Sequence, residues 1–355
     1  MSYSKIFSDL PELTYEVIKY FKNDFSTLHS CILVNRLWCR LAIPLLWENP
    51  FSIPTGNYNF IGIYLHNLNG DLKAQLNEYK IDGNLFPSNT LFNYPIFLKY
   101  LYTWKIISSI EEWSKDVELE YSSILEFKRL IHMSLFKVII KNKVNIHTFD
   151  IHITYPDSCI DDMLELMLQY PVFFYKIRKL KLRLFNSSPS YSKNFILQMI
   201  NLYQNLKQIS LNSSSFPIYQ SLLLSKDYNH SSSQLLPLKL EYLSLTLNIK
   251  YKNDFEMFLK NSQNTFIKKL LINNKGSKDD NKEGHDIHDF ILSYLKEYIM
   301  KKERIKYLAI INFNTDLFSF KDEVKEFELY NIKIQKYCDL FIDSNLKFVE
   351  ELEDF

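Results

Sequence analysis

The sequence predicts an α/β protein in which helices alternate with the parallel strands of one sheet. Two observations lead to this prediction. An apolar pattern typical of buried strands recurs from residue 144 onward, and helical patterns lie between most of its copies. The chain has 355 residues and is 46% hydrophobic, so it can bury a large core. We expect an N-terminal helical region at 1–50, a mostly helical linker or degenerate first repeats at 51–143, and a repeat array at 144–355.

The recurring pattern has the form L-x-x-L-x-L, which marks the strand of a leucine-rich repeat. Seven segments match it with apolar residues: Ile146-Phe149-Ile151, Ile177-Leu180-Leu182, Leu206-Ile209-Leu211, Leu240-Leu243-Leu245, Ile267-Leu270-Ile272, Ile305-Leu308-Ile310 and Val324-Phe327-Leu329. Their middle residues are 31, 29, 34, 27, 38 and 19 positions apart. Units of this size bury their apolar faces by stacking, so we expect a leucine-rich-repeat-like solenoid with a parallel strand sheet and outer helices. An ordinary α/β domain is the alternative.

Apolar residues at helical spacing precede the array and recur within it. The helical segments that we expect are 71–79, 95–113, 122–140, 194–204, 254–260 and 286–300.

Composition argues against several classes of function. The 42 basic and 41 acidic residues leave a net charge of +1, which produces no overall attraction to nucleic acid or an anionic membrane. Four Cys without a CxxC pair argue against a disulfide scaffold or a Cys-rich zinc module. The six Gly form neither GxGxxG nor GxxxxGK[ST], and we expect no cofactor. The sequence has no secretory signal pattern and no apolar run of about 18 residues. We therefore expect a protein of the cytoplasm, the nucleus or both, without a membrane partner.

Two groups of polar residues could carry chemistry. His285 and His288 lie beside acidic residues, a composition that can bind a metal ion. No third ligand is evident, so we expect an exposed helix start there and no metal site. The basic string from Lys176 to Arg183 alternates with apolar residues, and a single strand is a small footprint for nucleic acid. We expect no nucleic-acid partner, and an enzyme is the third-ranked hypothesis.

The first fifty residues predict three short helices. Pro11 fits the first turn of the first helix, and Val17 and Ile18 lie at helical spacing from Leu13. Asn23-Asp24 breaks this pattern, Ser26 can cap a second helix, and a third helix carries Trp38. Together the three helices hold more apolar side chains than so small a unit can bury. Surplus apolar surface of this kind indicates a partner.

This region resembles the F-box family. The matching residues, in order, are Leu10-Pro11, Ile18, Phe21, Leu28, Cys31, Val34-Asn35-Arg36, Trp38, Leu41-Ala42 and Leu46-Trp47. The family docks on the Skp-family adaptor of a cullin–RING (SCF-type) ubiquitin ligase, and the remainder of the chain presents a protein substrate. Leucine-rich repeats are a common C-terminal partner of F-boxes. An unrelated helical hairpin, with Trp38 and Trp47 in its core, is the alternative.

The resemblance implies a substrate-recognition subunit with no chemistry of its own. It would bind the adaptor directly and the cullin and RING subunits through it. The residues expected to contact the adaptor are Leu10, Pro11, Ile18, Leu28, Val34, Trp38, Leu46 and Trp47. A solenoid scaffold that binds proteins without any ligase is the alternative function.

The expected substrate surface follows from the alternation of side chains along a strand. Residues that flank the buried leucines share one face, which begins with the basic residues Lys179, Lys181 and Arg183. We expect these cations to bind an acidic protein segment, with Tyr242 and Tyr307 available for apolar contact. The seventh segment would add an acidic end to this face, through Glu326, Glu328 and Tyr330.

Overall fold

The computed structural model describes much of the chain in two compact units. The first unit comprises Met1–His147 with Glu165–Phe173, and the second comprises Thr148–Leu164 with Phe174–Phe355. The described residues are 10–53, 58–66, 68, 70–79, 89–116, 121–154, 158–170, 175–185, 205–213, 237, 239–247, 255–256, 259–260, 267–275, 284–299, 305–312 and 315–341.

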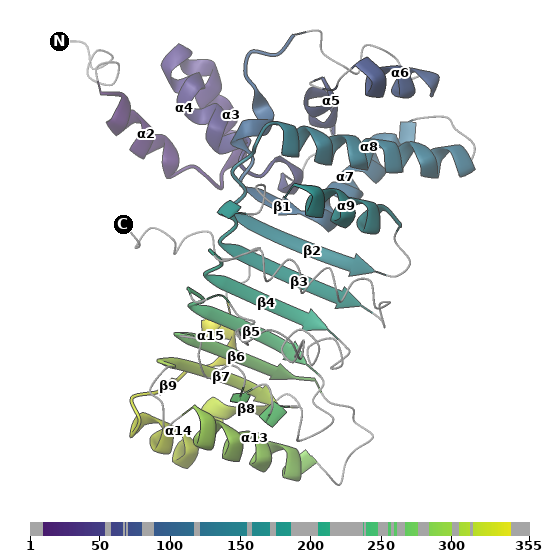
Figure 1. Ribbon diagram of the computed structural model, residues 1–355. Helices are drawn as coiled ribbons and strands as arrows, with labels where there is room; N and C mark the ends of the chain where they lie inside the picture. The colour runs from purple at the N-terminus through teal and green to yellow at the C-terminus, as the bar shows by residue number, and fades with distance from the viewer. Residues whose placement is uncertain are drawn as a thin grey trace, which may run out of the picture. The chain divides into compact units, whose positions relative to one another are not determined.

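The first unit begins with three short helices, as predicted. They are α2 (Pro11–Lys19), α3 (Phe25–Val34) and α4 (Arg36–Leu46) (Figure 1). Asp24 caps α3 by accepting a hydrogen bond from the Thr27 amide at 3.0 Å. Asn35 is extended, which ends α3, and its side chain accepts from the Trp38 amide at 2.9 Å to begin α4. Two cap residues therefore divide one apolar stretch into separate helices.

The three helices pack around a small shared core. Its fully or almost fully buried members are Ile18, Leu28, Cys31, Ala42 and Leu45. Partly buried side chains surround this core, and the list includes Tyr15, Phe21, Ile32, Trp38, Leu41 and Leu46.

The remainder of the first unit is mainly helical. Its elements are η1 (Pro50–Ser52), α5 (Phe60–Leu65), α6 (Gly70–Glu78), η3 (Tyr94–Phe97), β1 (Tyr100–Tyr102), α7 (Thr103–Trp113), η4 (Ser114–Asp116) and α8 (Tyr121–Lys141). Helices α6 and α8 confirm the predictions at 71–79 and 122–140.

The predicted helix at 95–113 is wrong in its first half, because only α7 is helical there besides the short turn η3. The backbone amides of Lys99 and Tyr100 donate to the Glu48 carbonyl at 2.9 and 3.2 Å. These long-range bonds hold the segment extended, a constraint that local apolar spacing does not contain.

The second unit is built on a mostly parallel sheet. Its long strands are β2 (Thr148–Thr154), β3 (Lys179–Phe185), β4 (Gln208–Ser213), β5 (Tyr242–Leu247), β6 (Lys269–Asn274) and β7 (Tyr307–Asn312). Each pairs in parallel with the next along the chain, and Figure 1 shows them as a ladder of arrows with one direction. Six of the seven predicted strand segments therefore lie on strands.

One continuous apolar row runs across these strands. The paired register aligns Phe149, Leu180, Ile209, Leu243, Leu270 and Leu308. None of these side chains is more than 2% exposed. The same template position is paired from strand to strand, so each of these apolar side chains lies next to its equivalent on the neighbouring strand.

Helices lie between some of the strands. Helix α9 (Ser158–Gln169) follows β2, and α13 (Gly284–Tyr298) precedes β7 and confirms the prediction at 286–300. The predicted helix at 194–204 lies outside the described residues, and at 254–260 only residues 255–256 and 259–260 are described, all four as helix.

The seventh predicted strand is wrong. Val324 and Phe327 belong to a helix, α14 (Lys321–Glu328), with Phe327 fully buried and Leu329 81% exposed. Apolar residues three apart fit a helix face as well as the first part of the strand template. Asn331 then adopts a left-handed conformation with φ 59°, and the Ile332 amide donates to the Phe327 carbonyl at 3.2 Å, which ends the helix.

The chain closes the second unit with short elements. They are β8 (Thr315–Asp316), η8 (Leu317–Ser319), β9 (Lys333–Ile334) and α15 (Tyr337–Leu340). Strand β8 pairs antiparallel with β7, and β9 pairs with β7 in parallel. Since the seventh segment is not a strand, Glu326, Glu328 and Tyr330 do not extend the polar sheet face as predicted.

The apolar row predicts the effect of a core truncation. Replacing Leu243, which is fully buried, with Ala should lower the free energy of unfolding by about 2–5 kcal/mol, because it removes packed methyl groups and leaves a cavity. Urea denaturation followed by circular dichroism measures the change. The matched control Leu329→Ala alters an exposed leucine and should change stability by less than about 0.5 kcal/mol. Equal effects of the two substitutions would contradict the assigned core.

Candidate functional site

The first candidate surface is apolar and lies on the N-terminal helices. Leu10 and Leu13 are each 48% exposed, and Leu33 and Val34 at the end of α3 are 76% and 57% exposed. Tyr20, just after α2, is 82% exposed. These side chains lie outside the shared core of the three helices, so they are available to a partner.

The predicted adaptor-contacting residues divide into two groups. Leu10, Pro11 and Val34 are exposed, and Trp38 and Leu46 are partly buried against the helical core. The structure corrects the prediction for the other three. Ile18 and Leu28 are fully buried and Trp47 is 8% exposed, so they support the surface from inside and do not form it.

Sequence reasoning missed Leu33 as an exposed residue. The signal was present, because α3 ends in four consecutive apolar residues, from Cys31 to Val34. Successive residues of a helix are about 100° apart, so four in a row cannot all face one core. Cys31 is buried, whereas Leu33 and Val34 face outward.

Trp47 and Glu48 join the helices to the rest of the first unit. The Trp47 ring lies 5.8 Å from that of Tyr64 and 4.2 Å from that of Tyr94, centroid to centroid. The Glu48 carboxylate is 4% exposed and forms ion pairs with Lys22, at 2.8 Å, and with Lys99. A buried carboxylate left without a cation is costly, so these ion pairs help to hold the end of α2 near β1.

The second candidate surface is the polar face of the sheet. The register places Lys179, Lys181 and Arg183 of β3 in three rows across this face. Their neighbours on β2 are Thr148, Asp150 and His152, and those on β4 are Gln208, Ser210 and Asn212. We call Lys179, Lys181 and Arg183 the basic strip. All three side chains are partly exposed.

Asp150 is a buried carboxylate beneath this strip. It is fully buried, and its Oδ2 accepts a hydrogen bond from Arg183 Nη2 at 2.9 Å. Burial raises the pKa of Asp150, and the nearby cations Arg183 and Lys181 oppose that increase. Burial and Arg183 also lower the pKa of His152. Arg183 therefore serves partly as the counter-ion of Asp150.

The prediction that Tyr242 is available for a substrate is wrong. Tyr242 is 3% exposed, because Tyr337 and Leu340 of α15 pack against it together with Leu271 and Ala309. The predicted contact residue Tyr307 is only partly exposed and packs against the same cluster, with Lys269 Nζ 5.7 Å from its ring centroid. The apolar part of the polar face is thus covered by the chain itself.

Helix α15 is held in place by polar contacts at its start. The Tyr337 amide donates to Asp316 Oδ2 at 2.9 Å, and Asp316 Oδ1 accepts from the Phe318 amide at 2.9 Å. Burial raises the pKa of the Tyr337 hydroxyl, and hydrogen bonds with Ser244, Thr246 and Asn273 oppose that increase.

Sequence reasoning missed this cover. The available signal was the spacing of Tyr337, Leu340 and Phe341, which places three apolar side chains on one face of a helix.

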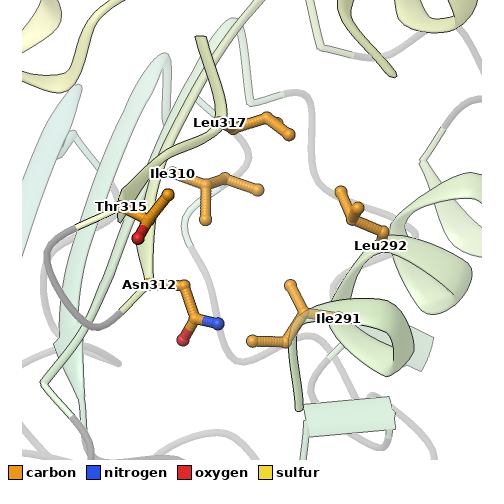
Figure 2. A pocket seen from close by; sticks show the side chains of 6 residues that line it. All are labelled: Ile291, Leu292, Ile310, Asn312, Thr315 and Leu317. Carbon is orange, nitrogen blue, oxygen red and sulfur yellow. The ribbon is translucent and has the colours of Figure 1, made fainter. Parts of the chain in front are cut away.

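The described residues show little that suggests catalysis or a membrane. One small open hollow, with room for about one water molecule, lies between α13 and β7, lined by Ile291, Leu292, Ile310, Asn312, Thr315 and Leu317 (Figure 2). It is far smaller than a typical ligand pocket of roughly 300 Å³ or more, and no titratable side chain lines it. Within the described parts of the chain, no three His, Cys, Asp or Glu form a metal-binding group. The side chains of His285 and His288 are outside the description. No described helix is long and apolar enough to cross a membrane.

Comparison with known proteins gives no assignment. No family model, curated protein or solved structure matches the chain. Its function must therefore be argued from the two surfaces themselves.

The Asp150–Arg183 pair predicts a pH-dependent effect. Replacing Arg183 with Met leaves the buried Asp150 carboxylate without its cation, so the free energy of unfolding at pH 7 should fall by about 3 kcal/mol. This value is the lower end of the range for a buried pair, because the Arg183 side chain is 30% exposed. The pKa of Asp150 in the folded protein then rises further above its unfolded value. A carboxyl whose pKa is raised by folding stabilises the folded protein at low pH, and this stabilisation is lost as the pH rises. The loss of stability caused by Arg183→Met should therefore become smaller toward pH 4.

Urea denaturation at pH 7 and pH 4.5 measures this effect. Lys207→Met is the matched control, since the Lys207–Glu241 pair is about half exposed at both ends and should contribute less than about 1 kcal/mol. An Arg183→Met deficit that does not depend on pH would contradict a buried ionised Asp150.

Proposed function

We propose that this protein is a substrate-recognition subunit of a cullin–RING ubiquitin ligase, with α2 to α4 as an F-box that binds a Skp-family adaptor. The observation that carries the proposal is the exposure of Leu10, Leu13, Leu33 and Val34 on a three-helix unit whose own core does not use them. Burying a fully exposed side chain of this kind yields about 1.5–3 kcal/mol before the cost of association, and Leu10 and Leu13, which are 48% exposed, would yield about half as much. This surface therefore suits a stable protein partner.

The second unit supports the recognition part of the proposal. We propose that β2 to β7 form a leucine-rich-repeat-like array, because one strand template recurs in register across all six strands. Such an array presents a row of variable side chains on its polar face, while the apolar row holds the units together. The basic strip on that face favours an acidic protein substrate.

The proposal assigns no chemistry to this chain. Isopeptide formation requires a reactive thiol or the zinc site of a RING partner, and these would be supplied by other subunits. The three Cys in the described residues are Cys31, Cys39 and Cys338, of which Cys31 is buried with its pKa raised by desolvation. A raised pKa disfavours the thiolate, so Cys31 is suited to packing.

Calorimetry with a purified Skp-family adaptor tests this function. The double substitution Leu33→Gln and Val34→Gln keeps good helix formers but removes apolar surface, so it should weaken binding at least about 30-fold, the equivalent of about 2 kcal/mol. Leu10→Ala with Pro11→Ala should weaken binding in the same direction.

Leu91→Gln is the control for that experiment. Leu91 is 89% exposed in the same unit but lies outside the three helices, so its substitution should leave the affinity unchanged. If the wild-type chain does not bind the adaptor, the ligase assignment fails, and a protein-binding scaffold becomes the better hypothesis. If the wild-type chain binds and the Leu33/Val34 variant binds equally well, the assigned surface is wrong.

A further inference from the structure

The polar face of the sheet has two parts with different properties. Over β5 to β7 it is apolar and covered, since Tyr242, Leu271 and Ala309 pack under Tyr337 and Leu340. Over β3 it is basic and partly exposed, through Lys179 and Lys181. Both parts belong to the same face, because the register aligns Lys179 with Tyr242 through Gln208 of β4.

The chain continues from α15, at the covered part of the face, and the basic part lies close by. Helix α15 and the following Phe341 already lie against β5 to β7, within the apolar cluster. Adjacent strands are about 4.8 Å apart, so β3 lies about 10 Å from β5. The nine residues from Phe341 to Glu350 can span up to about 30 Å when extended. Residues that follow Phe341 can therefore reach the basic strip.

The sequence after Phe341 has the charge that the basic strip would attract. Residues 342–355 lie outside the described part of the chain, and they contain five acidic residues and one lysine. Four of the acids fall within five positions, at Glu350, Glu351, Glu353 and Asp354. The strip lies on a partly buried surface beside Asp150, where opposite charges interact more strongly than in bulk water. We call residues 343–354 the acidic segment.

We propose that the acidic segment binds Lys179 and Lys181 of the same chain and so competes with any acidic partner for the basic strip. Tethering favours this occupant, because a short link gives the segment an effective concentration in the millimolar range at the strip. A free partner at micromolar concentration must overcome that competition. The inference concerns only the second unit, so it stands or falls independently of adaptor binding and ligase function.

A peptide-binding experiment on the full-length chain tests this competition. The probe is a fluorescein-labelled synthetic peptide of residues 342–355, whose binding is followed by fluorescence anisotropy. In the wild-type chain the tethered segment competes with the probe. Neutralising it with Glu350→Gln, Glu351→Gln, Glu353→Gln and Asp354→Asn should strengthen probe binding on the order of tenfold. Binding to the neutralised chain should weaken as the salt concentration rises.

Two further variants of the neutralised chain locate the site. Adding Lys179→Glu and Lys181→Glu should abolish probe binding, whereas adding Lys239→Glu should leave it unchanged. Lys239 is an exposed lysine that precedes β5, so it controls for the general loss of positive charge. Arg183 stays unaltered in every variant, because it neutralises the buried Asp150.

A second measurement needs no substitution. A carbodiimide joins lysine amines to carboxylates in contact, and mass spectrometry of the wild-type chain should find Lys179 or Lys181 linked to residues 350–354. Equal probe affinity for the wild-type and neutralised chains would overturn the proposal. Probe binding that survives Lys179→Glu with Lys181→Glu, or cross-links that map to other lysines instead, would overturn it as well.

Discussion

The second unit depends on the in-register packing of one apolar side chain per strand. Phe149, Leu180, Ile209, Leu243, Leu270 and Leu308 form a row because each parallel strand pairs with the next at the same template position. A slip of one residue in any pair would turn that strand's apolar side chains to the polar face. The row therefore determines both the strand order and which side chains lie on the polar face.

This register also determines which charged and polar side chains lie next to one another on the polar face. Its rows bring Asp150 beside Lys181 and Arg183, although β2 and β3 are separated by a helix in the sequence. A carboxylate buried there requires a cation, so Arg183 is partly structural, while the Lys179 and Lys181 side chains are partly exposed. At the far end of the sheet the chain covers its own apolar residues with α15. One face thus has three parts: the Asp150–Arg183 ion pair, the lysines of β3, and the apolar residues covered by α15.

The N-terminal helices present the opposite situation, an apolar surface with no cover among the described residues of their unit. Their core is small, and five residues supply it, so the other apolar side chains of α2 and α3 are left outside. The Glu48 carboxylate, paired with Lys22 and Lys99, anchors these helices to the segment that follows them. An exposed apolar surface of this kind is typical of protein interaction sites.

The sequence by itself determined the α/β class, the three N-terminal helices and six strands with their register, because these depend on apolar periodicity and capping residues that are local in the chain. It also identified the basic strip, since strand alternation follows directly from the buried positions.

Tertiary structure decided the rest. Val324 and Phe327 suited helix and strand equally until packing selected α14, and the extended segment at β1 depends on hydrogen bonds to the distant Glu48. Whether Ile18, Leu28 and Trp47 face a partner or a core, and whether Tyr242 is open or covered, depends on contacts between residues far apart in the sequence. Local pattern specifies that a side chain is apolar and on which face of its element it lies, but only the folded chain specifies what covers that face.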